Sequence, residues 1–400
     1  MPAGGGPILG SVERQVPRET RQVDFDDFER LNFRLPGPTP LPPAVREAMR
    51  RPMIHHRGPL LKRFYVDLLA KLRQIHRTEH DVLVWPGSGS AGWEAAIVNL
   101  LSPGDAVLAT VIGDFGDRWA KAAARLGLDV RRLDCPWGQA LTVEELSEAL
   151  ERNPDVKAVF LTHNETSTAV TNPLPELAAA VRDHGALVLV DAVSSAAALP
   201  LETDAWGLDV VLSGSQKAWM CPPGLVIAAF GLRCWDAYEA SRYPRFFWDI
   251  RSARDMASQG MTPTTPPLTL LYALDAATDL IQAEGLEKVW ERHARLGRKT
   301  RDGVTDLGLE LLADPNHSSD SVTAVNVPEG LTSRRIIDHM VERHRVLLQG
   351  GQGPMVETVV RIGHMGWCDE VAIDDVLASL AATRNELGLP VAGRAAIGAA

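Results

Sequence analysis

Short apolar runs alternate with longer segments of helical period between Asp81 and Gly231. Apolar runs bounded by turn residues are typical of strands buried on both faces, and the segments between them are typical of covering helices. The alternation therefore predicts a parallel sheet with helices on both faces. The expected strands are Val82–Trp85, Ala106–Val111, Val130–Leu133, Ala158–Thr162, Ala186–Val190, Val210–Leu212 and Leu225–Phe230, and the expected helices lie near Ala91–Leu101, Arg118–Leu126, Val143–Arg152 and Leu174–His184.

The pattern differs on either side of this region. Residues 32–40 are rich in proline, which predicts a rigid loop before helices at Pro43–Arg50 and Leu60–Arg77. A helical pattern from Leu268 to Arg298 predicts one long helix, and a smaller α+β pattern follows it. We therefore expect an N-terminal arm over residues 1–35, a large domain over residues 36–298 and a small C-terminal domain over residues 299–400.

The charge balance narrows the possible partners. With 41 basic and 51 acidic residues the net charge is −10, which argues against nucleic acid or an anionic membrane surface as the main partner. No apolar run approaches the roughly 20 residues of a membrane span, and the N-terminal residues lack the apolar core of a signal peptide. The four cysteines have no zinc-like spacing, so we expect reduced thiols, no metal site and a cytoplasmic protein.

One lysine, Lys217, lies between two predicted core strands, where a positive charge is unexpected. It lies in the segment Ser213–Gly224, between the apolar run Val210–Leu212 and a Pro-Pro-Gly turn. Its stem could cover apolar surface while its ammonium reaches water, as in most lysines. Alternatively, desolvation at a strand end could lower its pKa enough for it to act as an amine nucleophile and form a Schiff base.

Two other features also fall at strand ends. Asp191 follows the apolar run at residues 186–190, at the edge where open α/β sheets bind ligands, and could be structural or a counter-ion for a protonated ring nitrogen. The segment Gly87–Ser90 opens a helix, so it is either a serine-capped turn or an anion site made of free N–H groups. A phosphate cradle, a ring-nitrogen carboxylate and a Schiff-base lysine together predict pyridoxal 5′-phosphate as cofactor.

These segments resemble the class V aminotransferases, in the branch of the alanine–glyoxylate and serine–glyoxylate (serine–pyruvate) enzymes. The resemblance spans about residues 30 to 385. It implies an α/β fold of type I, in which a large domain with a mostly parallel sheet between helices is joined to a smaller C-terminal α+β domain. It also implies a homodimer and ping-pong transamination. The motifs that carry it are Gly87–Ala96, Leu161–Thr168, Asp191–Ser195, Ser213–Ala218, Pro222–Gly224 and Arg361–Gly363.

The resemblance implies roles for individual residues around the cofactor. Lys217 matches the lysine that forms the Schiff base, Asp191 matches the partner of the ring nitrogen, and Phe115 stands where an aromatic ring stacks on the cofactor. The other implied contacts are a phosphate cup of Ser88, Gly89 and Ser90, ring contacts from Thr166 and Val193, and phosphate contacts from Gln216 and from Thr265 of the partner subunit.

Three residues are implied on the substrate side. Arg361 matches the arginine that binds the substrate α-carboxylate, for which a guanidinium fork is suited by its bidentate geometry. Gly37, in a Pro-Gly-Pro loop, is expected to bound a small pocket. Arg57 could bind a second carboxylate, as could Arg245.

Several functions stay open on the sequence alone. The first is transfer of an amino group from alanine or serine to glyoxylate or pyruvate, with an aspartate donor as a variant. The second is a class V lyase or cysteine desulfurase, which would need a mobile nucleophilic cysteine near the pocket, and Cys221 and Cys368 are the candidates. The third is a non-catalytic interaction protein on an enzyme scaffold.

Overall fold

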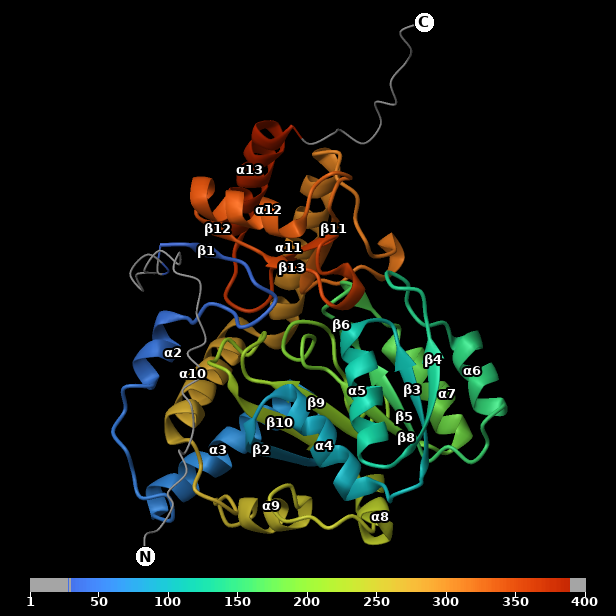
Figure 1. Ribbon diagram of the computed structural model, residues 1–400. Coiled ribbons are helices and arrows are strands. Elements are labelled where there is room, and N and C mark those ends of the chain that lie inside the picture. Colours follow the sequence, from blue (N-terminus) through green and yellow to red (C-terminus); the bar gives the residue numbers. More distant parts are fainter. Residues whose placement is uncertain (1–27, 29, 389–400) are drawn as a thin grey trace, which may run out of the picture. The chain divides into compact units, whose positions relative to one another are not determined.

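A seven-stranded sheet forms the centre of the chain (Figure 1). The structure, a computed structural model, describes residue 28 and residues 30–388, so most of the expected arm lies outside the described residues. The strand order is β2-β10-β9-β8-β5-β3-β4, and the pairs from β9 to β4 are parallel. The strands are β2 (Asp81–Gly87), β3 (Ala106–Val111), β4 (Asp129–Asp134), β5 (Ala158–Thr162), β8 (Leu187–Asp191), β9 (Val210–Gly214) and β10 (Gly224–Phe230).

The predicted α/β fold is confirmed, and each predicted strand of this sheet is present. β3, β5, β8 and β9 are buried along their whole lengths, as expected for continuous apolar runs between two helical layers. β10 differs because it runs antiparallel to both of its neighbours, β2 and β9. The carboxyl ends of the parallel strands therefore meet along one edge of the sheet.

Helices cover both faces of the sheet (Figure 1). Alternate side chains along a strand point to opposite faces and so pack against different helical layers. In β5, Val159 and Leu161 join one core, whereas Ala158 and Phe160 join the other. The first core contains side chains from α2 (Pro43–Ala48), α3 (Pro59–His76), α6 (Val143–Glu151), α7 (Leu174–His184) and α10 (Leu268–Glu284). The second contains side chains from α4 (Gly89–Leu100), α5 (Asp114–Arg125), α8 (Arg233–Ala240) and α9 (Ile250–Ala257).

The single long helix predicted from residue 268 to residue 298 is wrong. Two helices occupy this stretch, α10 and α11 (Leu286–Asp306), and Gly285 separates them. Gly285 has φ +90° and ψ +127°, a backbone conformation that glycine adopts without steric cost and that ends the helical hydrogen-bonding pattern. The helical period continues on both sides of this residue, which is why the sequence pattern alone indicates one helix.

A second sheet follows α11, with the strand order β11-β14-β13 and β14 in the centre. Its strands are antiparallel, and two helices and a π-helical turn surround it. None of the helices in the described residues is long and apolar enough to cross a membrane. The elements of this region are β11 (Val322–Asn326), α12 (Ser333–His339), the turn η2 (Met340–His344), β12 (Val346–Leu347), β13 (Gln349–Gly350), β14 (Val359–Gly363) and α13 (Glu370–Leu387). Three further short strands come earlier in the chain: β1 (Asn32–Phe33), β6 (Asn164–Glu165) and β7 (Val170–Thr171).

Candidate active site

A cavity of about 250 Å³ lies at the carboxyl edge of the large sheet. Its walls come from the residues that follow β2, β3, β5, β8 and β9, which is the edge where open α/β sheets bind ligands. Most of the predicted cofactor residues therefore share one cavity. The lining residues are Ser88, Gly89, Ser90, Trp93, Phe115, Arg118, Thr162, Asn164, Thr166, Asp191, Val193, Ser194, Gln216 and Lys217.

Lys217 is buried, with 7% of its surface exposed, so it is not a lysine whose ammonium reaches water. Its Nζ donates a hydrogen bond of 2.6 Å to the carbonyl oxygen of Pro36. Burial, with the nearby charge of Arg361, lowers the pKa of Lys217 to about 8. About a tenth of the amine is therefore neutral at pH 7, far more than for an ordinary lysine.

The predicted pocket loop contacts this lysine directly. A Cβ atom on Gly37 would lie 2.4 Å from Cδ of Lys217, and the φ of Gly37 is +112°. A side chain at this position would collide with the lysine and strain the backbone. Gly37 thus lies against the lysine, although it does not itself line the cavity.

Asp191 ends β8 and is held by two donors. Its Oδ2 accepts a hydrogen bond of 2.8 Å from the Trp93 indole, and its Oδ1 accepts one of 2.8 Å from the backbone N–H of Val193. Burial raises the pKa of Asp191, while these hydrogen bonds and the charge of Lys217 oppose the rise. Each carboxylate oxygen can accept a further hydrogen bond, so the group can still bind a cationic N–H.

The start of α4 forms the predicted cradle. The Ser88 side chain makes no capping hydrogen bond, so the observed contacts do not support a serine-capped turn. A Cβ atom on Gly89 would lie 2.5 Å from Cγ2 of Val193, so only a glycine lets the two segments approach this closely. Two side-chain oxygens, Oε1 of Gln216 and Oγ1 of Thr162, are buried without a hydrogen-bond partner. Unpaired polar atoms and free helix N–H groups fit a polar, phosphate-bearing ligand.

Arg361 lies just behind the cavity wall. Its Nη1 donates hydrogen bonds to the carbonyl oxygen of Thr166 at 3.2 Å and to Oε1 of Gln352 at 2.9 Å, and its Nε donates one to Gly350 at 2.9 Å. Burial lowers the pKa of Arg361 to about 10, so the guanidinium stays charged near neutral pH. The contact with Thr166 places this buried cation next to a lining residue.

Glu165 has no role in the sequence reasoning, yet it organises one wall. Its carboxylate accepts hydrogen bonds from the backbone N–H groups of Phe115, at 3.1 Å, and Gly116, at 3.2 Å, and from the Ser167 hydroxyl at 2.6 Å. Burial raises its pKa to about 7. A carboxylate at the first turn of α5 satisfies free N–H groups there and so fixes Phe115 at the cavity.

Three of the predicted or considered residues lie elsewhere. Arg57 donates hydrogen bonds to the carbonyl oxygens of Thr262, at 2.7 Å, and Pro263, at 3.2 Å, and Thr265 in the same segment is exposed. Arg245 stacks on the Tyr238 ring at 3.7 Å. None of these side chains lines the cavity of its own chain.

The arginine that does line the cavity is Arg118, which the sequence reasoning missed. Its guanidinium lies 5.4 Å from the ring centre of Phe115, which stands one helical turn earlier in α5. The predicted helix began at Arg118, whereas α5 begins at Asp114, so the spacing of three residues that puts Arg118 beside Phe115 was missed. Trp93 was missed as well, because its contact with Asp191 depends on how α4 packs against the sheet.

Comparison with known families decides what this cavity belongs to. Residues 36–366 match the model of the family described as aminotransferase class-V. The chain belongs to the class V aminotransferases. Pyridoxal 5′-phosphate is the cofactor of this class V aminotransferase, and the lysine, the carboxylate and the cradle around the cavity are the groups that fit it.

Individual relatives cover nearly the whole class V aminotransferase chain. A protein named soluble hydrogenase, small subunit, from Synechococcus sp. is 39% identical over 90% of this chain and 94% of its own length. An L-aspartate–glyoxylate aminotransferase from Paracoccus denitrificans is 38% identical over 89% of this chain and 92% of its own. The solved alanine–glyoxylate aminotransferase from Nostoc sp. has a TM-score of 0.85, with 30% identity over 94% of this chain and 100% of its own. These matches confirm the fold of type I.

Proposed function

We propose that this aminotransferase moves the amino group of a small amino acid, alanine or serine, to glyoxylate or pyruvate by a ping-pong mechanism. The observation that carries the proposal is the buried Lys217, whose pKa is about 8, in one cavity with Asp191 and the Gly89 cradle. Both the Paracoccus relative and the Nostoc structure are named for glyoxylate as a substrate. This would be a reaction of amino acid metabolism, and we place it in the cytoplasm.

Each residue has a distinct task in this proposal. The cofactor, when bound, supplies an electron sink for the negative charge that develops on the substrate carbon. Lys217 carries the cofactor and then moves the proton at the substrate α-carbon through its Nζ as base and acid. Asp191 holds a proton on the ring nitrogen, because a buried carboxylate stabilises a cationic N–H. Ser88, Gly89, Ser90 and Gln216 bind the phosphate, Phe115, Thr166 and Val193 contact the ring, and Gly37 and Arg361 face the substrate.

We also propose that the active form is a homodimer. Thr265 is exposed and outside the cavity lining, although the resemblance places a threonine there on the phosphate of the partner subunit. Arg57 holds the backbone of this segment through Thr262 and Pro263. In this proposal Arg57 positions Thr265 for the active site of the partner subunit. Arg57 also stays a candidate for binding the substrate.

A second candidate donor is aspartate, which one observation favours. Arg118 lines the cavity and is half exposed, so its guanidinium can reach a second carboxylate on the donor. The Paracoccus relative is named for aspartate. Arg118, more than Arg57 or Arg245, is therefore the residue that would select a dicarboxylic donor.

Single half-reactions test the proposal and separate the donors. Purified protein loaded with pyridoxal 5′-phosphate is mixed with alanine, serine or aspartate, and conversion to the amine form of the cofactor is followed by absorbance. We expect fast conversion with alanine or serine, and with aspartate if Arg118 recognises it. Arg118→Gln should then slow aspartate alone, while the control Arg125→Gln on the same helix changes nothing. Conversion with none of a broad set of amino acids would contradict the transaminase proposal.

Among residues 30–388, no contact favours a desulfurase. Cys221 and Cys368 are both buried, burial raises the pKa of both thiols, and neither lines the cavity. A nucleophilic cysteine needs a low pKa and access to the substrate. We therefore expect no release of sulfide from cysteine, and sulfide release would revive this alternative.

A further inference from the structure

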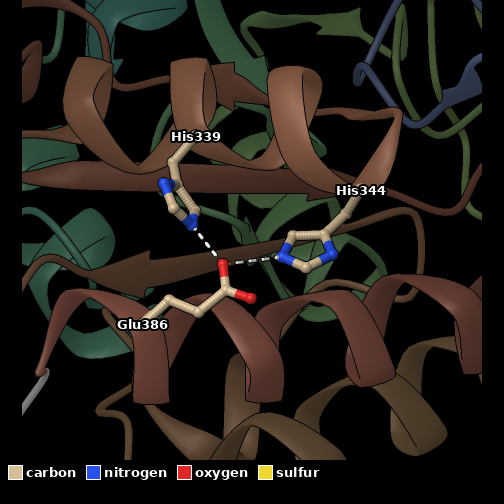
Figure 2. A group of neighbouring side chains, drawn as sticks. All are labelled: His339, His344 and Glu386. Atoms are coloured by element: carbon tan, nitrogen blue, oxygen red, sulfur yellow. Dashed lines mark hydrogen bonds and ion pairs between the residues drawn. The ribbon is translucent and has the colours of Figure 1, made fainter.

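Two histidines and a glutamate meet on the small C-terminal part of the chain, on elements that do not line the cavity (Figure 2). His339 ends α12, His344 ends the turn η2, and Glu386 lies in the last turn of α13. Oε2 of Glu386 lies 2.6 Å from Nε2 of His339 and 3.3 Å from Nε2 of His344. Figure 2 shows both imidazole rings directed at this one carboxylate.

The backbone between the two histidines is unusual. They are five positions apart, and on a regular α-helix side chains at that spacing would point about 140° away from one another. Residues 340–344 instead form a π-helical turn, in which the N–H of Arg345 bonds to the carbonyl of Met340. The wider turn absorbs one residue and brings both rings to the same face, and such turns occur frequently at functional sites.

The three groups have the chemistry of a transition-metal site. Their ligand atoms all lie within 4.8 Å of one another, and two ligands of a tetrahedral zinc ion stand about 3.3 Å apart when each bond is about 2.0 Å. Imidazole nitrogen favours zinc, copper and nickel over magnesium or calcium. The side chains are 21%, 18% and 38% exposed, so water can reach a fourth position.

Helix electrostatics also favour a cation here. Glu386 stands one residue from the end of α13, where the helix dipole is negative and a carboxylate is unfavourable. A divalent ion between the two imidazoles and the carboxylate would neutralise this charge. All eleven histidines and four cysteines of the chain fall among residues 30–388, and in that range no other three His, Cys, Asp or Glu side chains come this close together.

We propose that His339, His344 and Glu386 bind one zinc ion, with water as the fourth ligand, and so fasten the turn η2 to the end of α13. The ion has a structural role and takes no part in transamination. No metal site was expected from the sequence, since the four cysteines have no zinc-like spacing. The π-helical turn brings His339 and His344 together, which their spacing of five residues does not indicate.

Calorimetric titration of the tag-free holoenzyme with zinc sulfate tests the proposal. We expect one ion per chain, no competition from excess magnesium, and binding at least about 100-fold weaker in His339→Gln/His344→Gln. His80→Gln is the matched control, since His80 faces the single carboxylate of Asp204 at 3.9 Å, and it should bind zinc as the unmodified protein does. Equal binding by the double variant, or no binding by the unmodified protein, would overturn the proposal.

Two further readouts keep the test independent of folding and of activity. The zinc absorption edge should show nitrogen and oxygen neighbours at about 2.0–2.2 Å, and sulfur at about 2.3 Å would place the ion on cysteine and refute the site. Zinc should also raise the unfolding temperature of the unmodified protein but not of Glu386→Gln. Transamination by the double variant should match that of the unmodified enzyme, so a failed metal test leaves the proposed function standing.

Discussion

The cavity at the sheet edge and the segment at residues 262–267 both carry residues predicted to hold the cofactor, but they are built differently. In the cavity, Asp191 and Lys217 leave the ends of buried strands, and neighbours of the same chain fix both side chains. Thr265 is exposed, and its segment is held through backbone carbonyls by Arg57. In our proposal, a single chain arranges the catalytic groups, and a second copy of the chain supplies the outer phosphate contact.

The largest change should come from breaking the cavity at Asp191. Asp191→Asn keeps an acceptor for the Trp93 indole but removes the negative charge that we propose faces the ring nitrogen. We expect the kcat of transamination to fall by about 10²–10³-fold, the range for loss of one preorganised electrostatic contact. Asp134→Asn is the control, because Asp134 also ends a parallel strand of this sheet yet lies outside the cavity. A similar loss in both variants would mean that general stability, and not the charge at Asp191, explains the effect.

The next change concerns the buried cation behind the cavity wall. Arg361→Lys retains a positive charge but loses the planar fork that pairs with a carboxylate through two hydrogen bonds. We expect KM for every amino donor to rise by about 30–150-fold, since the loss of a charge-assisted hydrogen bond costs about 2–3 kcal/mol. Arg384→Lys removes an arginine that bonds the carbonyl of Leu307 instead, and should leave KM unchanged. An increase for one donor only would show that Arg361 reads the side chain and not the shared α-carboxylate.

The pKa of Lys217 predicts how fast the cofactor-free protein takes up pyridoxal 5′-phosphate. Attack requires the neutral amine, and burial sets the pKa of this amine at about 8. Below that pH the loading rate should fall about tenfold per unit, because each unit lowers the neutral fraction tenfold. Stopped-flow absorbance across pH 6 to 9 measures this directly. Glu165→Gln should speed loading near pH 7, since the Glu165 charge raises the pKa of Lys217.

Strand-end residues are the part of the site that sequence reasoning can reach. Apolar runs locate the strands, and the polar residue after each run must then lie at the sheet edge, which is how Asp191, Lys217 and Gly89 were found. Glu165, Trp93 and Arg118 escape this reasoning because their contacts depend on how helices and a short hairpin pack.

The fold, like the site, was predictable where the sequence pattern is regular and was not predictable where the backbone departs from regular geometry. All seven strands of the large sheet were predicted, and all but β4, which contains Arg131 and Arg132, follow from apolar runs, whereas the break at Gly285 and the π-helical turn at residues 340–344 do not follow from the pattern. Both exceptions are changes of backbone geometry within a continuing helical period. A periodic pattern indicates which face of a helix is buried. It does not indicate where a single residue changes the backbone geometry.

The smallest effect should come from the outer segment. Thr265→Ala should weaken cofactor retention by about fivefold or more, since an ordinary hydrogen bond contributes about 1 kcal/mol and one to a charged phosphate contributes somewhat more. The exposed Thr358 supplies the control Thr358→Ala, which should retain the cofactor normally.

Mixed dimers of Lys217→Ala and Thr265→Ala chains decide which copy Thr265 serves. If it acts across the interface, the one site with Lys217 receives an intact Thr265 from the other chain and binds the cofactor normally. Retention that stays fivefold weaker in the mixed dimer would place the contact within one chain.

Identifying the lysine that bonds covalently to the cofactor is the most direct test of whether Lys217 forms the Schiff base. Borohydride reduction of the holoenzyme would fix pyridoxal 5′-phosphate to that lysine, and peptide mass analysis would identify it among the lysines of the chain. The account predicts a single labelled peptide containing Lys217, no label in Lys217→Ala, and normal labelling in the surface variant Lys157→Ala. A label on any other lysine, or a fully active Lys217→Ala enzyme, would contradict it.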